Sequence, residues 1–223
     1  MSFYHQPRIV TNGLVFYMDA GNPNCYTGDG SIVYDLGPNK SDGSLGSTLF
    51  DINNKGSFVF GSHASALIMP DISAYSHTES HTYSAWIYPS IISGYKWIIA
   101  NGAGGTGGTS LVITNSTIGF FYSGGGGVDS GNDLININEW TYVTTIFHSS
   151  PRSVSFYKNG IFDVSRTITS TWTAVNNNPM LASSWDSIFY YTGRIATAQI
   201  YNRALNDVEV LQNYNALKGR YGL

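Results

Sequence analysis

The sequence has few charged residues, a single cysteine and no long apolar run. Charged residues make up 11% of the 223 residues, against about 25% in an average globular protein. The surface therefore has to be built largely from Ser, Thr, Asn, Tyr and Gly. The 11 Lys and Arg residues are dispersed and the formal net charge is −3, which argues against a nucleic-acid partner. The lone Cys25 excludes an internal disulfide.

Targeting and membrane signals are also missing. The opening residues, MSFYHQPRIV, lack a basic segment followed by an apolar stretch, so no secretory signal peptide is predicted. No apolar run approaches the roughly 18 residues that a membrane span needs. These absences favour a soluble protein made in a cytoplasm, without a membrane partner.

Residues typical of β-structure are abundant. The chain has 16 Tyr, 11 Phe, 5 Trp and 25 Gly, which suit half-buried strands and the turns between them. The dipeptide Asn159-Gly160 predicts a hairpin turn. Regular strand spacing without a linker or repeat indicates one β-sandwich domain. Strands are predicted at 14–18, 32–36, 57–60, 66–69, 82–89, 96–100, 110–114, 118–122, 139–147, 153–160, 161–168, 179–186 and 194–201.

One helix is predicted near the C-terminus. Asn206 can act as the N-cap and Glu209 occupies the third helical position of a capping box. Gly219 is the expected stop. A helix this short is marginal alone in water, so it should pack on the sandwich. Its expected apolar face consists of Val208, Leu211, Tyr214 and Leu217.

Five phrases resemble a known family, in the family's order. They are GLVFYMDAGN (13–22), SFVFGSHASALIMP (57–70), HTYSAWIYP (81–89), INEWTYVTTIF (137–147) with SVSFYKNGIFD (153–163), and TGRIATAQIYNRALNDVEV (192–210). The chain thereby resembles the laminin-G-like domains of the concanavalin A-like lectin/glucanase superfamily. The resemblance implies an all-β, two-sheet antiparallel jelly-roll sandwich with a short C-terminal helix. We expect an N-terminal arm at 1–12, the domain at 13–217 and a C-terminal tail at 218–223.

The ending of the chain, with NYNALKGRYGL, is similar to virion proteins of tailed bacteriophages, especially those that infect cyanobacteria. This resemblance implies a non-enzymatic structural protein of the virion, in capsid decoration, tail or fibre. Its partners would be other virion proteins, further copies of itself and host-surface glycans. The tail residues Lys218, Arg220 and Tyr221 are the expected docking contact. The alternative is a carbohydrate-binding, lectin-like adhesion module.

An enzyme is the third hypothesis, because the superfamily also contains glycoside hydrolases. A retaining glycosidase needs two carboxylates about 5–5.5 Å apart, and related glucanases carry several acids on one strand. The three glutamates, Glu79, Glu139 and Glu209, lie in separate segments without another acid at strand spacing. We therefore expect no glycosidase activity.

Metal sites are considered at two places, although no cofactor is expected. Asp19, Asn22, Asp29 and Asp35 lie in loops and offer the oxygen ligands that Ca²⁺ prefers, but turn formation is the favoured interpretation. The acids that relatives use near 61–65 and at Ala196 are replaced here. The run HTESH (77–81) could supply two histidines to zinc, and an exposed polar loop is the favoured alternative.

Several aromatic residues are candidates for stacking on a sugar ring. An exposed aromatic plane beside amide and hydroxyl groups suits a sugar, and it equally suits a protein interface. Trp86, Trp140, Phe58 and Phe60 lie in the family phrases and are expected in the core. The candidates for a carbohydrate or partner site are Trp185, Tyr190 and Tyr191 in the loop SSWDSIFYY, and Tyr95 with Trp97.

Overall fold

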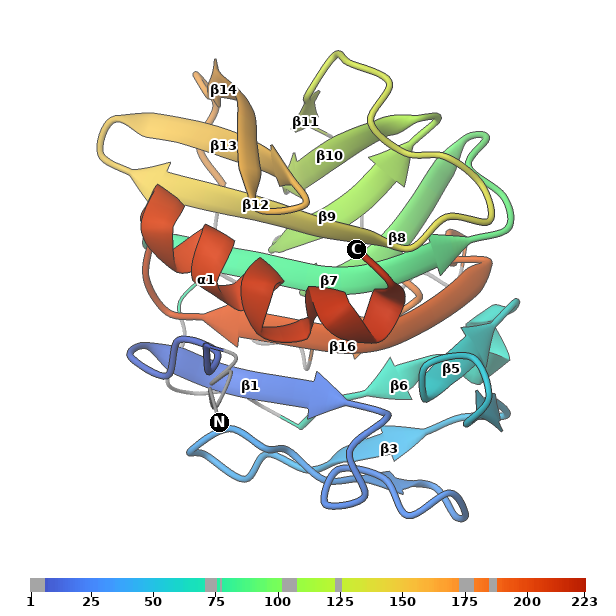
Figure 1. Cartoon of the computed structure of the whole chain (residues 1–223). Coiled ribbons are helices and arrows are strands. Elements are labelled where there is room, and N and C mark those ends of the chain that lie inside the picture. Colours follow the sequence, from blue (N-terminus) through green and yellow to red (C-terminus); the bar gives the residue numbers. More distant parts are fainter. Residues whose placement is uncertain are drawn as a thin grey trace.

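Two antiparallel β-sheets pack face to face, and one helix covers the outer side of the first (Figure 1). The structure is a computed structural model. It describes residues 7–70, 76, 78–101, 108–122, 126–172, 179–184 and 188–223. The predicted all-β sandwich with a short C-terminal helix is confirmed.

The first sheet, sheet A, carries the helix. Strand β16 lies inside it and pairs with β7 along one edge. On its other edge β16 pairs with β5 through residues 193–195 and with β1 through residues 197–201. The strands in order are β14 (Ile161–Thr167), β13 (Arg152–Lys158), β12 (Thr141–Ser149), β7 (His81–Pro89), β16 (Gly193–Tyr201), β5 (Ser57–Phe60) and β4 (Leu49–Asp51), with β1 (Leu14–Asp19) beside β16.

The second sheet, sheet B, lies behind sheet A in Figure 1. Its longest strands are β8, β9 and β10, and its edges are short. Short edge strands limit unwanted pairing with other chains. The strands in order are β11 (Gly126–Asp129), β10 (Thr117–Tyr122), β9 (Thr109–Thr114), β8 (Tyr95–Asn101), β15 (Met180–Leu181), β6 (Leu67–Ile68), β3 (Gly43–Leu45) and β2 (Ile32–Val33).

The core lies between the sheets and follows strand alternation. In β7, Tyr83, Ala85 and Ile87 face the core. Trp86 and Trp140, which were expected in the core, are buried in a separate cluster under the helix, because successive side chains of a strand point to opposite faces. Phe58, which is fully buried, also joins the core as expected. Burying one such aromatic side chain contributes about 1.5–3 kcal/mol.

The hairpin prediction is confirmed, and three strands were missed. Asn159 and Gly160 both take positive φ angles, 51° and 78°, and connect β13 to β14. Strands β3, β4 and β11 lie in stretches for which no strand was predicted. In β11, a side chain at Gly126 would collide with the ring of Tyr122, so glycine is used there for close packing rather than for a turn.

Helix α1 (Asp207–Leu217) has the predicted capping box. The Asn206 side chain accepts from the Glu209 backbone N–H at 3.0 Å, and the Glu209 carboxylate accepts from the Asn206 backbone N–H at 3.0 Å. A 3₁₀ helix, η2 (Lys218–Tyr221), follows directly, and a shorter one, η1 (His63–Ser65), precedes β6. None of the described helices is long and apolar enough to cross a membrane.

The predicted buried face of this helix is confirmed for two of its four residues, and the predicted stop was wrong. Tyr214 and Leu217 pack against the cluster on sheet A, whereas Val208 is 74% and Leu211 43% exposed. Val210 and Asn213 are buried instead, because packing on sheet A decides which side of the helix is covered. The left-handed residue that ends the segment is Gly222, with φ 77°, rather than Gly219.

Residues expected in the N-terminal arm pack against this helix from position 8 onward. The Val10 backbone N–H donates to Asn213 Oδ1 at 2.8 Å, and Asn213 Nδ2 donates to the Tyr201 hydroxyl at 3.0 Å. The Tyr201 hydroxyl donates in turn to the Val10 carbonyl at 3.0 Å. These bonds tie the arm, β16 and α1 together.

The C-terminal segment lies on sheet A, across β7 and β16, instead of projecting for docking (Figure 1). Tyr221 is 7% exposed and stacks on Trp86 at a centroid distance of 3.9 Å. Arg220 makes a bidentate pair with Asp19, at 2.5 and 2.8 Å. The third expected docking residue, Lys218, places its ammonium 5.5 Å from the centroid of the Tyr214 ring. All three residues thus contact the domain itself.

Candidate functional site

Four aromatic side chains gather on the outer face of sheet B. We call this set the aromatic surface: Tyr95, Trp97, Phe121 and Phe189. Strand alternation places it outside the core, because Leu111 and Ile113 of β9 face inward while Val112 between them packs with Trp97. Three strands or turns distant in sequence therefore supply one continuous surface.

Within this surface, Trp97 is buried and Tyr95 is partly exposed. Trp97 is 4% exposed and lies under Phe189, with centroids 6.1 Å apart and planes at 28°. Tyr95 is 43% exposed and meets Phe121 and Phe189 edge-on at 5.1 and 5.7 Å. A buried ring that fixes an exposed ring lowers the entropy lost on binding.

Tyr190 follows Phe189 in the chain and lies beside a positive charge. Its ring is 37% exposed, and the Lys96 ammonium lies 5.8 Å from its centroid. An isolated bridge pairs Tyr190 with Ser183 and fixes the backbone. Tyrosine hydroxyls and an ammonium next to exposed rings offer hydrogen bonds at the edge of an apolar platform.

The sequence candidates divide between surface and core. Tyr95 lies on the aromatic surface and Trp97 forms its base. Tyr190 is an exposed residue next to Phe189 in the chain, and its ring lies near the Lys96 ammonium. Tyr191 is fully buried among core residues, where burial raises the pKa of its hydroxyl. Trp185 lies outside the described residues.

Phe121 and Phe189 were missed as site residues. Phe120 and Phe121 are neighbours on β10, so one faces the core and the other faces outward. The period-two pattern of IGFFY could have identified Phe121 as an outer residue. Phe189 joins the surface only through tertiary contact with Trp97 and Tyr95.

The calcium candidates are engaged in local structure. Asp19 is paired with Arg220. The Asp35 carboxylate accepts backbone N–H bonds from Tyr17, Gly37 and Ser41 at 2.8, 2.7 and 3.0 Å. Carboxylates used in this way have few lone pairs left for a cation.

The two remaining calcium candidates form turns. The Asn22 side chain accepts from the Asn24 backbone N–H at 3.0 Å, and Asp29 accepts from the Gly30 backbone N–H at 2.8 Å. Both are local bonds typical of Asx turns. Within the described part of the chain, no three His, Cys, Asp or Glu side chains cluster as metal ligands would.

The described part of HTESH (77–81) does not offer a histidine that is available to bind zinc. His77 lies outside the described residues. His81 is fully buried and its Nδ1 donates to the Glu79 carbonyl at 2.8 Å. Its Nε2 lies 3.1 Å from the Thr109 hydroxyl, which also bonds the Tyr83 hydroxyl at 2.8 Å. Both ring nitrogens therefore serve a buried hydrogen-bond network.

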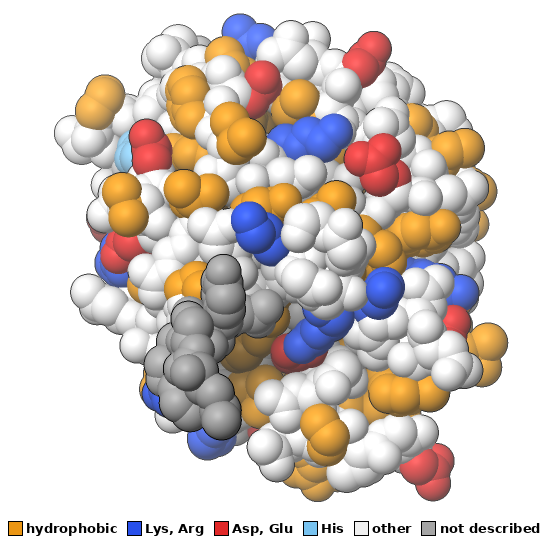
Figure 2. Space-filling model, viewed as in Figure 1, with side chains coloured by type: hydrophobic (Ala, Val, Ile, Leu, Met, Phe, Trp, Pro, Cys, Tyr) orange, Lys and Arg blue, Asp and Glu red, His pale blue; other side chains and the backbone are white. Residues whose placement is uncertain are grey.

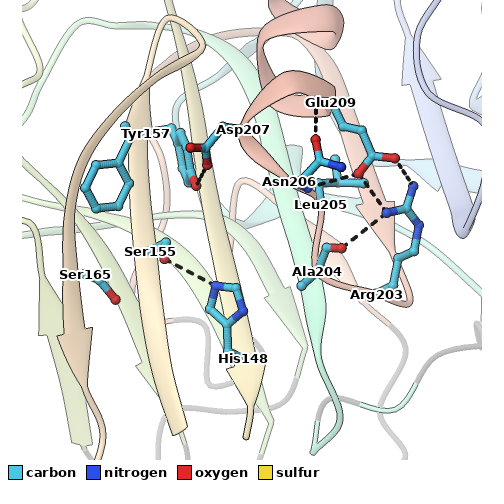
Figure 3. Close-up of a pocket in the computed structure, with 11 residues that line it drawn as sticks. His148, Ser155, Tyr157, Ser165, Arg203, Ala204, Leu205, Asn206, Asp207 and Glu209 are labelled. Carbon is cyan, nitrogen blue, oxygen red and sulfur yellow. Dashed lines mark hydrogen bonds and ion pairs between the residues drawn. The ribbon is translucent and has the colours of Figure 1, made fainter. Parts of the chain in front are cut away.

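A second candidate is a pocket of about 590 Å³ on the outer face of sheet A (Figure 3). Strands β12 to β14 form one side, and the β16–α1 connection with the first turn of α1 forms the other. We call it the helix pocket. It is lined by His148, Ser155, Tyr157, Phe162, Ser165, Arg203, Ala204, Leu205, Asn206, Asp207 and Glu209.

Two hydrogen-bonded pairs, each with a carboxylate as acceptor, shape the helix pocket. The Tyr157 hydroxyl donates to Asp207 Oδ1 at 2.7 Å, and burial together with this carboxylate raises the pKa of Tyr157. Arg203 holds Glu209 through two bonds of 2.6 and 2.8 Å. The Arg203 hydrogen bonds lower the pKa of Glu209.

The pocket also contains a serine–histidine pair. His148 Nε2 lies 3.2 Å from Ser155 Oγ, and burial lowers the pKa of His148. A hydrolase of this type needs a third group to orient the imidazole. Among the described residues nothing accepts from His148 Nδ1, so the pair is a polar contact rather than an assembled nucleophile.

Charges on the helix-bearing side are interspersed. Figure 2 shows Lys and Arg side chains scattered among acidic, polar and hydrophobic ones on this face. No broad field of a single sign is seen on the described part of this face, so recognition here depends on local groups rather than on long-range attraction.

A family model described as the concanavalin A-like lectin/glucanases superfamily matches residues 60–211. The chain belongs to this superfamily. Comparison with curated protein sequences finds no match.

Solved structures of the superfamily fold include sugar-binding domains. Domain 4 of AbnA, a GH43 extracellular arabinanase from Geobacillus stearothermophilus in complex with arabinotriose, has a TM-score of 0.71 at 18% identity, covering 92% of this chain and 100% of that domain. The ligand binding domain of botulinum neurotoxin serotype D, in complex with N-acetylneuraminic acid, has a TM-score of 0.68 at 15% identity, covering 92% and 51%.

The binding domain of Paraclostridial Mosquitocidal Protein 1 is similar to the same degree. Its TM-score is 0.69 at 17% identity, covering 92% of this chain and 52% of that one. The chain thus spans about half the length of these toxin domains. At such identities the likeness establishes the shared fold.

Proposed function

We propose that the protein is a non-enzymatic carbohydrate-binding module of lectin type, and that the aromatic surface holds the sugar. The observation that carries this proposal is the exposed ring of Tyr95, which packs with Phe121 and Phe189 over the buried Trp97. Two of the similar structures contain a bound sugar, arabinotriose or N-acetylneuraminic acid.

The chemistry of the surface fits a saccharide. The C–H face of a sugar ring packs on an aromatic plane, while its hydroxyl groups need polar partners at the rim. Tyr95 supplies an open ring with a hydroxyl, and Lys96 supplies a donor beside Tyr190.

Glycan-array screening followed by calorimetric titration tests the proposal. Tyr95→Ala should weaken binding by about tenfold, since losing one contact of about 1.4 kcal/mol changes affinity by that factor. Tyr34→Ala is a matched control, because Tyr34 is 43% exposed like Tyr95 and lies outside the surface. No array signal above background, or equal loss in the control, would count against the proposal.

We further propose that the module belongs to the virion of a tailed bacteriophage, as a capsid decoration, tail or fibre component that packs against other virion proteins. The low charge content of 11% supports this, as does the resemblance of the closing segment. Exposed Leu49 and Ile52, at 74% and 64%, offer apolar contacts near a sheet edge. Host-surface glycans would then be the target of the aromatic surface.

Mass spectrometry of purified intact virions tests this second proposal. The chain should be present in stoichiometric copies and should remain after washing with high salt. Its absence from the particles would reject the virion assignment while leaving carbohydrate binding intact. Incubation with any bound glycan should release no reducing sugar, because the proposed role is non-enzymatic.

A further inference from the structure

The helix pocket has the form of a built small-ligand site. Its volume of about 590 Å³ falls within the range of roughly 300–1,000 Å³ that ligand pockets occupy. In Figure 3 the side chains of Tyr157, Ser155 and His148 on the strands face those of Asp207 and Asn206 across the opening. The cavity therefore lies between a sheet floor and a helical wall, and both carry polar groups.

The wall of the pocket is fixed before any ligand arrives. Arg203 is held by both oxygens of Glu209 and also donates to the Ala204 carbonyl at 3.2 Å. Asp207 is held through Oδ1 by Tyr157. Side chains locked by their own hydrogen bonds lose little further entropy on binding.

The floor offers an aromatic edge next to hydroxyl groups. Phe162 is 48% exposed and meets Tyr157 edge-on, with centroids 5.5 Å apart. Ser155 and Ser165 are paired opposite each other on β13 and β14, and both line the cavity. An aromatic side chain beside hydroxyl and carboxylate acceptors fits a ligand that carries many hydroxyl donors.

The charge balance of the lining discriminates between ligand classes. The charged groups that line the pocket are Arg203, Asp207 and Glu209, and the lowered pKa of His148 keeps the imidazole neutral at neutral pH. Arg203 is neutralised by Glu209. Asp207 has no ion-pair partner among the described residues, and only the N-terminus of α1 offsets part of its negative charge. A ligand carboxylate would be repelled there, whereas a hydroxyl can donate to Asp207.

We propose that the helix pocket is a second saccharide site, specific for neutral sugar units and closed to acidic ones such as N-acetylneuraminic acid. This proposal rests on the proposed carbohydrate-binding function and adds a site on the opposite sheet from the aromatic surface. Two sites on one module raise the avidity for a multivalent glycan surface without any change in either contact.

Protein-observed NMR titration of the full chain tests the second site. The probes are arabinotriose with a panel of other neutral oligosaccharides, and N-acetylneuraminic acid as the acidic probe. The neutral probes should shift the amide signals of Ser155, Ser165 and Asp207. N-acetylneuraminic acid should leave these signals in place.

Two substitutions separate the pocket from the aromatic surface. Phe162→Ala should weaken the binding of neutral sugars at the helix pocket by about tenfold. The variant should keep the fold, because this side chain is half exposed. Asp207→Asn keeps an acceptor for Tyr157 but removes the charge, so neutral sugars should bind more weakly and the acidic probe should gain affinity. Tyr95→Ala, on the other sheet, should leave the pocket signals responsive.

The outcomes distinguish this inference from the proposed function. Binding that Tyr95→Ala removes and Phe162→Ala leaves unchanged would overturn the second site alone. A pocket that accepts N-acetylneuraminic acid as readily as neutral sugars would overturn its specificity. Failure of the unaltered protein to bind any glycan would overturn both.

Discussion

The outer faces of the two sheets carry similar aromatic clusters with opposite degrees of cover. On sheet A, Trp86 lies beneath Tyr221 and Tyr214, with centroids 3.9 and 5.6 Å away. On sheet B, Trp97 lies beneath Phe189, with Tyr95 open beside it. A tryptophan topped by another aromatic ring is thus a covered contact on one face and the base of the proposed binding surface on the other.

The difference comes from what the chain places on each face. Sheet A receives α1 and η2, which leave Tyr221 at 7% exposure. Tyr95 of sheet B keeps 43% of its surface. Both faces carry the same types of residue. What differs is whether another part of the chain covers the aromatic rings, as α1 and η2 do on sheet A. This distinction predicts opposite responses to the same substitution on the two faces.

The largest loss of stability is expected for Tyr221→Ala. This ring contacts Trp86 and also Trp140, at 4.8 Å. Its removal leaves a cavity and should cost about 3 kcal/mol of unfolding free energy. Urea unfolding followed by tryptophan fluorescence measures this. Leu223→Ala, at a 51% exposed position, is the control and should change the unfolding free energy little. A loss of unfolding free energy below about 1 kcal/mol for Tyr221→Ala would show that the tail is dispensable for stability.

A smaller loss is expected for Arg220→Met. Asp19 is 3% exposed, so removing its partner leaves a buried carboxylate without a counter-charge. Breaking a fully buried pair costs about 3–5 kcal/mol, and the partial exposure of Arg220 reduces our expectation to about 2 kcal/mol. The double variant with Asp19→Asn should recover part of the loss in the same urea experiment. Equal losses for single and double variants would contradict the coupling.

Glu209→Gln should have a modest and pH-dependent effect. Arg203 holds the pKa of Glu209 below its ordinary value of 4.5, so the charged form is favoured in the folded state. The stabilisation should be fully present above about pH 4.5 and should disappear as pH falls through the lower folded pKa. At neutral pH we expect about 0.5–1 kcal/mol. Thermal unfolding of both proteins between pH 3 and 7 tests this, and a difference that persists at the lowest pH would contradict it.

The smallest change in stability is expected for Tyr95→Ala. Its ring is nearly half exposed and contacts Phe121 and Phe189 only by their edges. We expect a loss below about 1 kcal/mol, together with the weakened glycan binding described above. A loss as large as that of Tyr221→Ala, measured by the same urea unfolding, would remove the contrast between the two faces.

Much of the fold could be predicted from local sequence patterns. Apolar and polar residues alternate along strand β7, and Asn159-Gly160 specifies the turn between β13 and β14. Asn206 with Glu209 specifies the start of α1. Each of these depends on neighbouring residues alone. Strand β11, with Gly126 and Gly127, depends on pairing with β10, so its own residues give no strand signal.

The buried face of α1 shows why hydrophobic periodicity has limits. Asn213 is fully buried on that face because it bonds Val10 and Tyr201. A polar residue with distant partners cannot be recognised as buried from spacing. The aromatic surface has the same limit, since Tyr95 and Trp97 were recognisable as candidates while their packing with Phe189 is tertiary.

The position of β16 has a consequence for synthesis of the chain. This strand lies inside sheet A and pairs with β1, β5 and β7, yet it is formed by residues 193–201. Strand β1 therefore has no sheet A partner until residues 197–201 have left the ribosome. Pairing between such distant segments is slow, and the early strands stay exposed to aggregation during that time. Translation speed and chaperone supply should accordingly govern the yield of folded protein more than its final stability does.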